Sequence, residues 1–191
     1  VKEIGSMHLV HRRDFMKTAA AAGVGVATPI FGRSEDSVWR TALVGSGWWG
    51  MNILRTALEA GRSRVVGMCD VDSNQLLPAA GEVESLTGRR PSLYEDYREL
   101  LAEQRPEIVI VATPDHWHPL ITIAAVKSGA HVYVEKPVGH TIMEGRAMVN
   151  AARKYDRVVQ VSTHRRVSPH NVSGMQFLKS GKAGKIVLDW K

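Results

Sequence analysis

The stretch Thr41-Ala-Leu-Val-Gly-Ser-Gly-Trp-Trp-Gly50 decides the fold of this 191-residue chain. An apolar run at 42–44 leads into a turn with the spacing Gly45-x-Gly47-x-x-Gly50, and a helical pattern follows. That order is typical of a dinucleotide-binding βαβ unit. Gly45 allows the tight turn, Gly47 lets the backbone approach a pyrophosphate, and Gly50 lets helix and strand pack closely. We expect the pyrophosphate on free N–H groups at the positive end of the helix. A generic glycine-rich turn is the alternative.

Asp70 follows Gly50 by twenty residues and comes directly after the second expected strand, 64–69. A carboxylate at this position accepts hydrogen bonds from the adenosine 2′- and 3′-hydroxyls and repels a 2′-phosphate. The sequence therefore favours NAD over NADP. Asp72 is the nearby alternative, and its other role is to cap the helix that begins near Ser73.

Strand and helix patterns alternate from residue 39 onward. The expected strands are 39–44, 64–69, 92–94, 108–112, 131–135 and 158–161, and the expected helices are 48–60, 73–86, 95–104, 119–128 and 141–155. Pro78 and Gly81 weaken the second helix. This alternation predicts one α/β domain, a doubly wound, mostly parallel sheet with helices on both faces.

Three polar clusters follow expected strands, at 113–118, 135–137 and 163–166. In a parallel sheet the strands' carboxyl ends share one edge, and ligands bind at that edge. We therefore expect these clusters and the glycine turn to surround one crevice. Lys136 stands between a buried strand and a proline, where an ammonium can polarise a hydroxyl or carbonyl beside a nicotinamide. The alternative for Lys136 is an ion pair with Glu135 or another neighbour.

His116 and His118 suggest a metal site, but no metal is expected because zinc needs further ligands at recognisable spacing. We expect these histidines to border the nicotinamide end and to cap the helix that begins at Pro119. Trp48 and Trp49 lie inside the glycine turn, where they shield a cofactor or pack in the protein.

The N-terminal region has the pattern of an export signal. Arg12 and Arg13 precede Phe15, and the weakly apolar run 18–30 follows. This order is typical of a twin-arginine signal read by the export machinery, and the run is too short to span a bilayer. Residues 25–27 form a poor cleavage site. The expected location is periplasmic, or membrane-anchored through an uncleaved leader.

Charge and cysteine content argue against a nucleic-acid partner and against a disulfide framework. The net charge is +6, of which +3 belongs to the first 33 residues. The rest is spread among mixed charges without an aromatic-interleaved basic patch, so we expect no nucleic-acid partner. Cys69 is the single cysteine, and no disulfide is possible within one chain.

Four segments together resemble the glucose–fructose oxidoreductase, inositol dehydrogenase and rhizopine-catabolism (Gfo/Idh/MocA) family. They are Gly45-Ser-Gly-Trp-Trp-Gly50, Ala112-Thr-Pro-Asp-His-Trp-His118, Gly129-Ala-His-Val-Tyr-Val-Glu-Lys-Pro137 and His164-Arg-Arg166. The resemblance covers about residues 40–190. It implies a Rossmann domain followed by a C-terminal α/β domain whose open sheet covers the active site and mediates oligomers. It also implies hydride transfer between NAD(P) and a sugar, a cyclitol or a related compound.

The resemblance implies roles for single residues. Gly45, Gly47, Gly50 and Asp70 hold the dinucleotide, Thr113, Pro114 and His118 line its nicotinamide side with Glu135 contributing, and Lys136 contacts the reacting hydroxyl. His164 stands where many relatives have Gln, and it joins Trp48 and Trp49 among the candidate cofactor-binding residues.

The expected organisation has three parts. Residues 1–38 are the leader and linker, and 39–162 the NAD(P)-binding Rossmann domain. Residues 163–191 are a connecting helix and, at 184–190, the first strand of a truncated C-terminal domain. The resemblance places the family's aspartate–histidine catalytic pair beyond Lys191. We therefore expect NAD binding with weak or no turnover, and an oligomer or a sugar-like substrate only where a C-terminal domain is present. The alternatives are an NAD-dependent glycosidase and a non-catalytic NAD-binding module.

Overall fold

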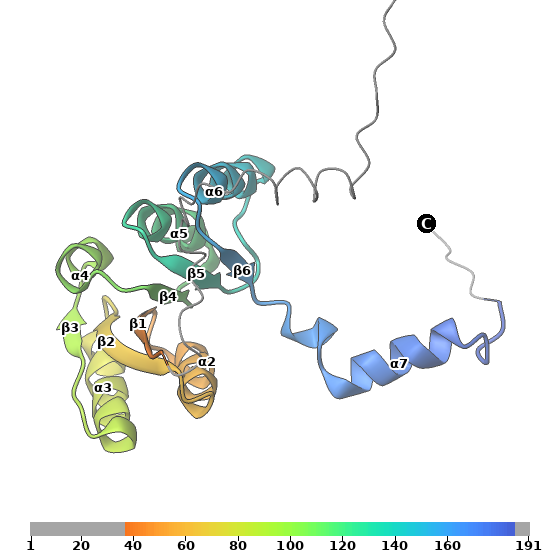
Figure 1. The fold of residues 1–191 in the computed structure, drawn as a ribbon, viewed down its shortest axis with the longest axis horizontal. Coiled ribbons are helices and arrows are strands. Elements are labelled where there is room, and N and C mark those ends of the chain that lie inside the picture. The colour runs from red at the N-terminus through yellow and green to blue at the C-terminus, as the bar shows by residue number, and fades with distance from the viewer. Residues whose placement is uncertain (1–36, 186–191) are drawn as a thin grey trace, which may run out of the picture. The chain divides into compact units, whose positions relative to one another are not determined.

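The computed structural model describes residues 37–185, and their six strands form one parallel sheet in the order β3-β2-β1-β4-β5-β6 (Figure 1). The strands are β1 (Trp39–Val44), β2 (Ser63–Cys69), β3 (Ser92–Tyr94), β4 (Ile108–Val111), β5 (His131–Val134) and β6 (Val159–Val161). The order reverses direction between β1 and β4, as in a doubly wound dinucleotide-binding sheet. The predicted fold is confirmed.

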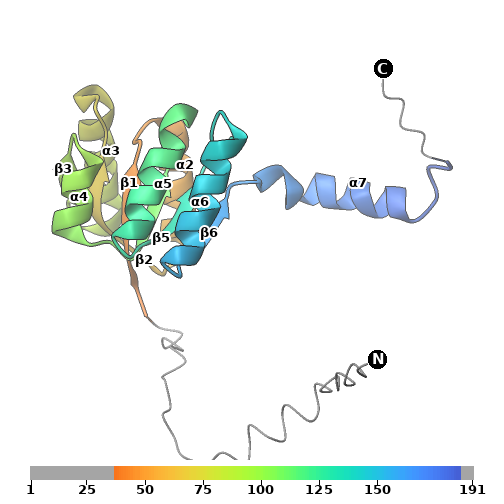
Figure 2. The ribbon, with the colours of Figure 1, turned by 90° about the horizontal axis from the view of Figure 1, so that it is seen from above.

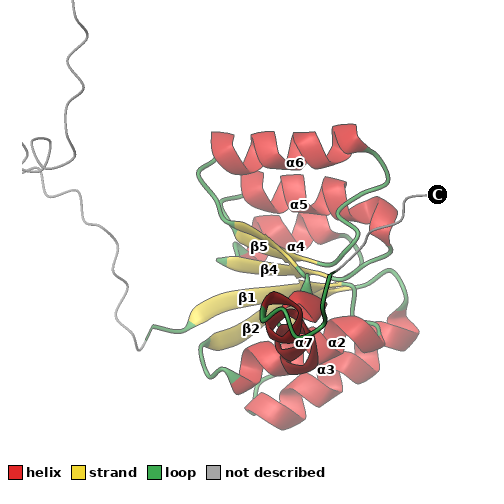
Figure 3. Ribbon diagram, turned by 90° about the vertical axis from the view of Figure 1, so that its right-hand side faces the viewer, coloured by secondary structure: helices red, strands yellow, loops and turns green. Residues whose placement is uncertain are grey.

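Helices cover both faces of the sheet (Figure 3). They are α2 (Trp48–Glu59), α3 (Ser73–Thr87), α4 (Tyr97–Gln104), α5 (His118–Lys127), α6 (Ile142–Lys154) and α7 (Pro169–Lys179), with short 3-10 helices η1 (Asp115–Trp117) and η2 (His164–Arg166). The helices α2 and α3 lie on one face, and α4, α5 and α6 lie on the other. Right-handed crossovers in opposite directions from β1 produce this arrangement.

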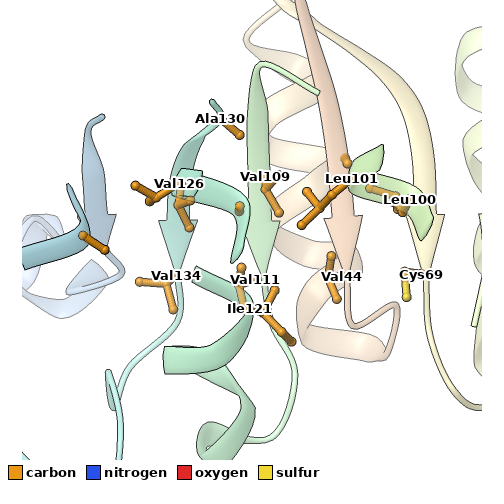
Figure 4. Packing of buried hydrophobic residues seen from close by; sticks show 14 of the residues in the cluster. Val44, Cys69, Leu100, Leu101, Val109, Val111, Ile121, Val126, Ala130 and Val134 are labelled. Atoms are coloured by element: carbon orange, nitrogen blue, oxygen red, sulfur yellow. The ribbon is translucent and has the colours of Figure 1, made fainter. Parts of the chain in front are cut away.

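Two apolar cores lie on the two faces of the sheet because side chains alternate along each strand. In β1, Ala42 and Val44 face α4 and α5, whereas Leu43 faces α2 and α3. Figure 4 shows the first core, in which Val109 and Val111 of β4 pack beside Leu101 and Ile121. The carboxyl ends of the strands are thereby held in fixed register on both sides.

The five expected helices agree with the structure to within one residue at each end, except at the start of α4. Pro78 and Gly81 do not break α3, which runs to Thr87 and ends at Gly88 with φ +71°. The burial of apolar side chains of α3 against the sheet compensates for the hydrogen bond that proline removes. The helix α4 begins at Tyr97 rather than 95, because the Asp96 side chain accepts a hydrogen bond from the backbone N–H of Arg98.

The C-terminal described segment holds η2 and α7, which follow β6 (Figure 2). A helix lies in the expected range, but its membership of a second domain stays a prediction. The leader up to residue 36 and most of the strand expected at 184–190 lie outside the described residues. Within 37–185, none of the helices has the length and apolar character needed to cross a bilayer.

Candidate functional site

The glycine turn connects β1 to α2 with almost no free space at two of its three glycines. Gly45 has φ +91°, and a Cβ there would lie 2.6 Å from the carbonyl carbon of Ala112. A Cβ on Gly50 would lie 2.0 Å from the carbonyl oxygen of Gly45. A Cβ on Gly47, by contrast, would meet no heavy atom within 4 Å. Close backbone packing therefore requires glycine at positions 45 and 50, whereas Gly47 leaves open space at the amino end of α2.

Asp70, at the carboxyl end of β2, is bonded to this turn. Its Oδ2 accepts hydrogen bonds from the backbone N–H of Ser46 at 2.7 Å and from Ser46 Oγ at 3.0 Å. Its Oδ1 accepts one from the backbone N–H of Asp72 at 3.1 Å. Asp72 itself caps α3 by accepting a hydrogen bond from the backbone N–H of Asn74, so its predicted capping role is confirmed. The turn and Asp70 thus form one rigid unit.

A cavity of about 430 Å³ opens beside this unit. Five predicted site residues line it: Gly45, Gly47, Asp70, Thr113 and Pro114. Sequence reasoning missed further lining residues, among them Val71, Tyr97, Arg98 and Trp117. The signal was present, because polar residues 95–98 also follow a strand, β3, and the carboxyl ends of parallel strands share one edge.

Arg98 lies on the rim of this cavity but is already engaged. Its guanidinium pairs with Asp96 at 3.0 Å and lies over the ring of Tyr97, 4.7 Å from the ring centroid. A paired guanidinium is less available to a 2′-phosphate than a free one, since it would have to exchange partners.

Cys69 lines the same cavity, and its thiol is held protonated. Burial, followed by the negative charge of Asp70, raises the pKa of Cys69 to about 12. Because the thiolate is the reactive form, we expect iodoacetamide to leave Cys69 unmodified in the folded protein at pH 8. Mass spectrometry would show full modification only after denaturation, and rapid modification of folded protein would contradict this assignment.

The ends of β4, β5 and β6 each carry a buried polar atom that has no hydrogen-bond partner within residues 37–185. These atoms are Thr113 Oγ1, Glu135 Oε1 and His164 Nδ1. Glu135 is only 4% exposed, and its other oxygen accepts a hydrogen bond from the backbone N–H of Lys136 at 3.1 Å. Buried polar atoms are rarely left unpaired in folded proteins. Three other such atoms, on Ser37, Thr122 and Arg157, lie elsewhere. The grouping of Thr113, Glu135 and His164 at one sheet edge nevertheless offers a place for a polar group from a ligand.

Lys136 follows Glu135 with an exposed side chain. Its contact with Glu135 runs through the backbone N–H, and its ammonium is in none of the ion pairs found among residues 37–185. The next peptide bond, Lys136–Pro137, is cis. The structure thus shows no ion pair between Lys136 and Glu135, and the contact of Lys136 with a substrate stays a prediction.

The two tryptophans of the glycine turn differ in environment. Trp48 is mostly in solvent, with 75% of its surface exposed. Trp49 instead packs on His164, and the centroids of the two rings are 5.4 Å apart. Trp49 and His164 border a second, mostly apolar cleft of about 640 Å³, which lies between α2 and strands β4 to β6. That cleft is larger than the cavity beside Asp70, but it lacks the acid and the open glycine that a dinucleotide requires.

His118 is 2% exposed, and its ring lies between two backbone carbonyls. Its Nδ1 is 2.6 Å from the carbonyl oxygen of Pro137, and its Nε2 is 2.9 Å from that of Thr113. Because both neighbours are acceptors, the ring donates an N–H to at least one of them. His118 thus lies buried beneath the rim of the site, and direct contact with a cofactor stays a prediction. Among residues 37–185, no three His, Cys, Asp or Glu side chains are grouped so as to hold a metal ion.

A doubly wound sheet with a glycine turn at β1 and a carboxylate at the end of β2 defines a dinucleotide-binding Rossmann domain. Residues 39–163 match the model of an oxidoreductase family with an NAD-binding Rossmann fold. The chain therefore belongs to the Gfo/Idh/MocA oxidoreductase family. Residues 10–29 match the twin-arginine translocation signal, which directs export to the periplasm.

Curated relatives include a glycosyl hydrolase family 109 protein of Shewanella baltica, 24% identical, with 95% of this chain and 45% of the relative aligned. A protein of the same description from Akkermansia muciniphila is 28% identical over 78% of this chain and 32% of its own length. The chain thus spans less than half the length of these relatives.

Solved structures show the same fold. Myo-inositol 2-dehydrogenase from Lactobacillus plantarum is 25% identical with a TM-score of 0.71, covering 79% of this chain and 44% of that protein. The WlbA dehydrogenase from Bordetella pertussis, in complex with NADH and UDP-GlcNAcA, is 25% identical with a TM-score of 0.66 over 78% of this chain and 44% of its own.

Proposed function

We propose that residues 39–163 bind NAD as the cofactor half of an exported dehydrogenase acting on a hydroxyl of a sugar, a cyclitol or a related compound. The observation that carries this proposal is the Asp70 carboxylate, hydrogen-bonded to Ser46 of the glycine turn beside a cavity of about 430 Å³. An acid bonded to this turn presents its oxygens where a ribose joins a pyrophosphate.

The residues present fit a dinucleotide along its whole length. Gly47 leaves room for a pyrophosphate at the amino end of α2, where backbone N–H groups lack helical partners. Asp70 accepts hydrogen bonds from ribose hydroxyls. At the far end, Thr113 Oγ1 and Glu135 Oε1 offer unpaired buried atoms to a carboxamide, which carries both donors and an acceptor.

Lys136 is proposed as the residue that contacts the reacting hydroxyl. Bound NAD supplies the hydride acceptor. The exposed Lys136 ammonium donates a hydrogen bond to the substrate oxygen and stabilises negative charge on it. Its backbone is fixed on the amino side, since the N–H of Glu135 donates to the carbonyl oxygen of Val111 at 3.0 Å.

Calorimetric titration tests this proposal. We expect NADH to bind the purified chain with a micromolar to submillimolar Kd, and to quench the fluorescence of the exposed Trp48. Lys136→Met should leave this Kd within about twofold, because the ammonium acts on the substrate rather than on the nucleotide. No response to NADH at millimolar concentration from folded protein would defeat the proposal.

An NAD-dependent glycosidase is the second candidate, favoured by the glycosyl hydrolase family 109 proteins among the relatives. In such an enzyme transient oxidation of the sugar precedes loss of the aglycone. Release of a chromogenic aglycone without net formation of NADH would favour the glycosidase, and net NADH formation from a free sugar or cyclitol would favour the dehydrogenase.

A further inference from the structure

Two histidines connect the loop that follows β4 with the loop that follows β5. We name these segments the β4 loop, residues 112–117, and the β5 loop, residues 135–140. The β4 loop holds Thr113 and Pro114, and the β5 loop holds Glu135 and Lys136. Both therefore carry candidate residues for the nicotinamide end.

The first connection is buried. His118 starts α5, and its ring nitrogens contact the carbonyl oxygen of Thr113 at 2.9 Å and that of Pro137 at 2.6 Å. Each carbonyl belongs to a different loop. Because the ring is 2% exposed, water cannot replace either contact without the loops moving apart.

The second connection lies at the surface. His140 Nε2 is 2.8 Å from Asp115 Oδ1, and this bond lowers the pKa of Asp115. The backbone N–H of His140 donates to Glu144 Oε2 at 2.8 Å, in the capping box of α6. His140 is therefore fixed on α6 while its ring holds the β4 loop.

The contacts of His118 and His140 involve the two loops that carry Thr113, Glu135 and Lys136, the residues assigned to the nicotinamide end and the substrate. The His118 ring lies between the carbonyl of Pro137, which directly follows Lys136, and the carbonyl of Thr113, whose hydroxyl is unpaired. It donates an N–H to at least one of these two acceptors. The distance between Thr113 and Glu135 depends on both loops. A group bound between them therefore depends on the histidine contacts.

We propose, on the basis of the proposed function, that His118 and His140 are positioning residues that set the nicotinamide end of the site and affect the adenosine end less. His118 makes the larger contribution because its contacts are buried. The adenosine end rests on Asp70 and the glycine turn. Thr113 and Pro114 of the β4 loop also line the cavity beside Asp70, whereas no residue of the β5 loop does.

Comparison of NADH with ADP-ribose isolates this role, because ADP-ribose keeps the adenosine and pyrophosphate and lacks the nicotinamide. We expect His118→Phe to raise the Kd for NADH about tenfold and to change that for ADP-ribose less than twofold. His118→Gln, which places an N–H near the position of Nε2, should recover about half of the loss on a logarithmic scale. His140→Leu should raise the Kd for NADH about twofold, and His140→Gln should restore it.

His170→Phe on α7 is the matched control, since this exposed histidine lies outside both loops and should leave both Kd values unchanged. If His118→Phe fails to fold, His118→Gln and the surface variant His140→Leu decide the question. Equal losses of NADH and ADP-ribose binding, or no loss of either, would overturn the inference. So would equal affinity of the unmodified protein for both ligands. Failure of the unmodified protein to bind even ADP-ribose would instead overturn the proposed function.

Discussion

Gly50→Ala is expected to lower the free energy of unfolding by about 3–5 kcal/mol, or to prevent folding, because a Cβ would lie 2.0 Å from the carbonyl oxygen of Gly45. The obstacle is backbone in a turn that is itself packed on Ala112, so no side-chain rotation relieves the overlap. Thermal and urea unfolding followed by circular dichroism would measure the loss.

Gly47→Ala is the matched control for Gly50→Ala. The same methyl group meets no atom within 4 Å at this position, and Gly47 has an ordinary φ of −64°. We expect its unfolding free energy to stay within about 0.5 kcal/mol of the unmodified value. Its NADH affinity should fall, because the methyl occupies the space proposed for the pyrophosphate. Equal stability of the two variants would show that the glycine turn is not packed as described.

The sequence predicted the sheet because its signals are local. Gly45, Gly47 and Gly50 lie within six residues, and the β-branched run at 108–111 needs only its own composition to indicate a buried strand. Asp70 could be selected because its distance from the glycine turn is set by one helix and one strand. The predicted order of elements therefore agreed with the structure, and the boundaries agreed to within one residue except at the start of α4, which Asp96 caps.

The parts that sequence reasoning missed depend on contacts between distant segments. Nothing local to His118 indicates that its ring would lie between Thr113 and Pro137, since that placement requires α5 to pack against the β5 loop. Tyr97 differs, because residues 95–98 follow β3 and could have been placed at the ligand-binding edge, but its position beside this particular cavity follows from the pairing of β3 with β2. Side-chain position at a sheet edge is set by tertiary packing, which periodicity does not encode.

Asp70→Asn is expected to weaken NADH binding about tenfold and to bring the Kd values for NADPH and NADH close together. The amide keeps the size of the side chain and one acceptor for Ser46, so the glycine turn retains a partner. The lost negative charge weakens the hydrogen bonds from ribose hydroxyls and removes the repulsion of a 2′-phosphate. Titrations with both nucleotides would measure the ratio directly.

Asp72→Asn removes the same charge two residues away and serves as the control. Asp72 caps α3 by accepting a hydrogen bond from the backbone N–H of Asn74, and asparagine caps helices about as well as aspartate. We therefore expect both the stability and the ratio of the two Kd values to stay unchanged in this variant. A ratio that moves equally in both variants would mean that general electrostatics, rather than Asp70 at the ribose, sets the nucleotide preference. A ratio that moves in Asp70→Asn alone ties that preference to the carboxylate bonded to the glycine turn.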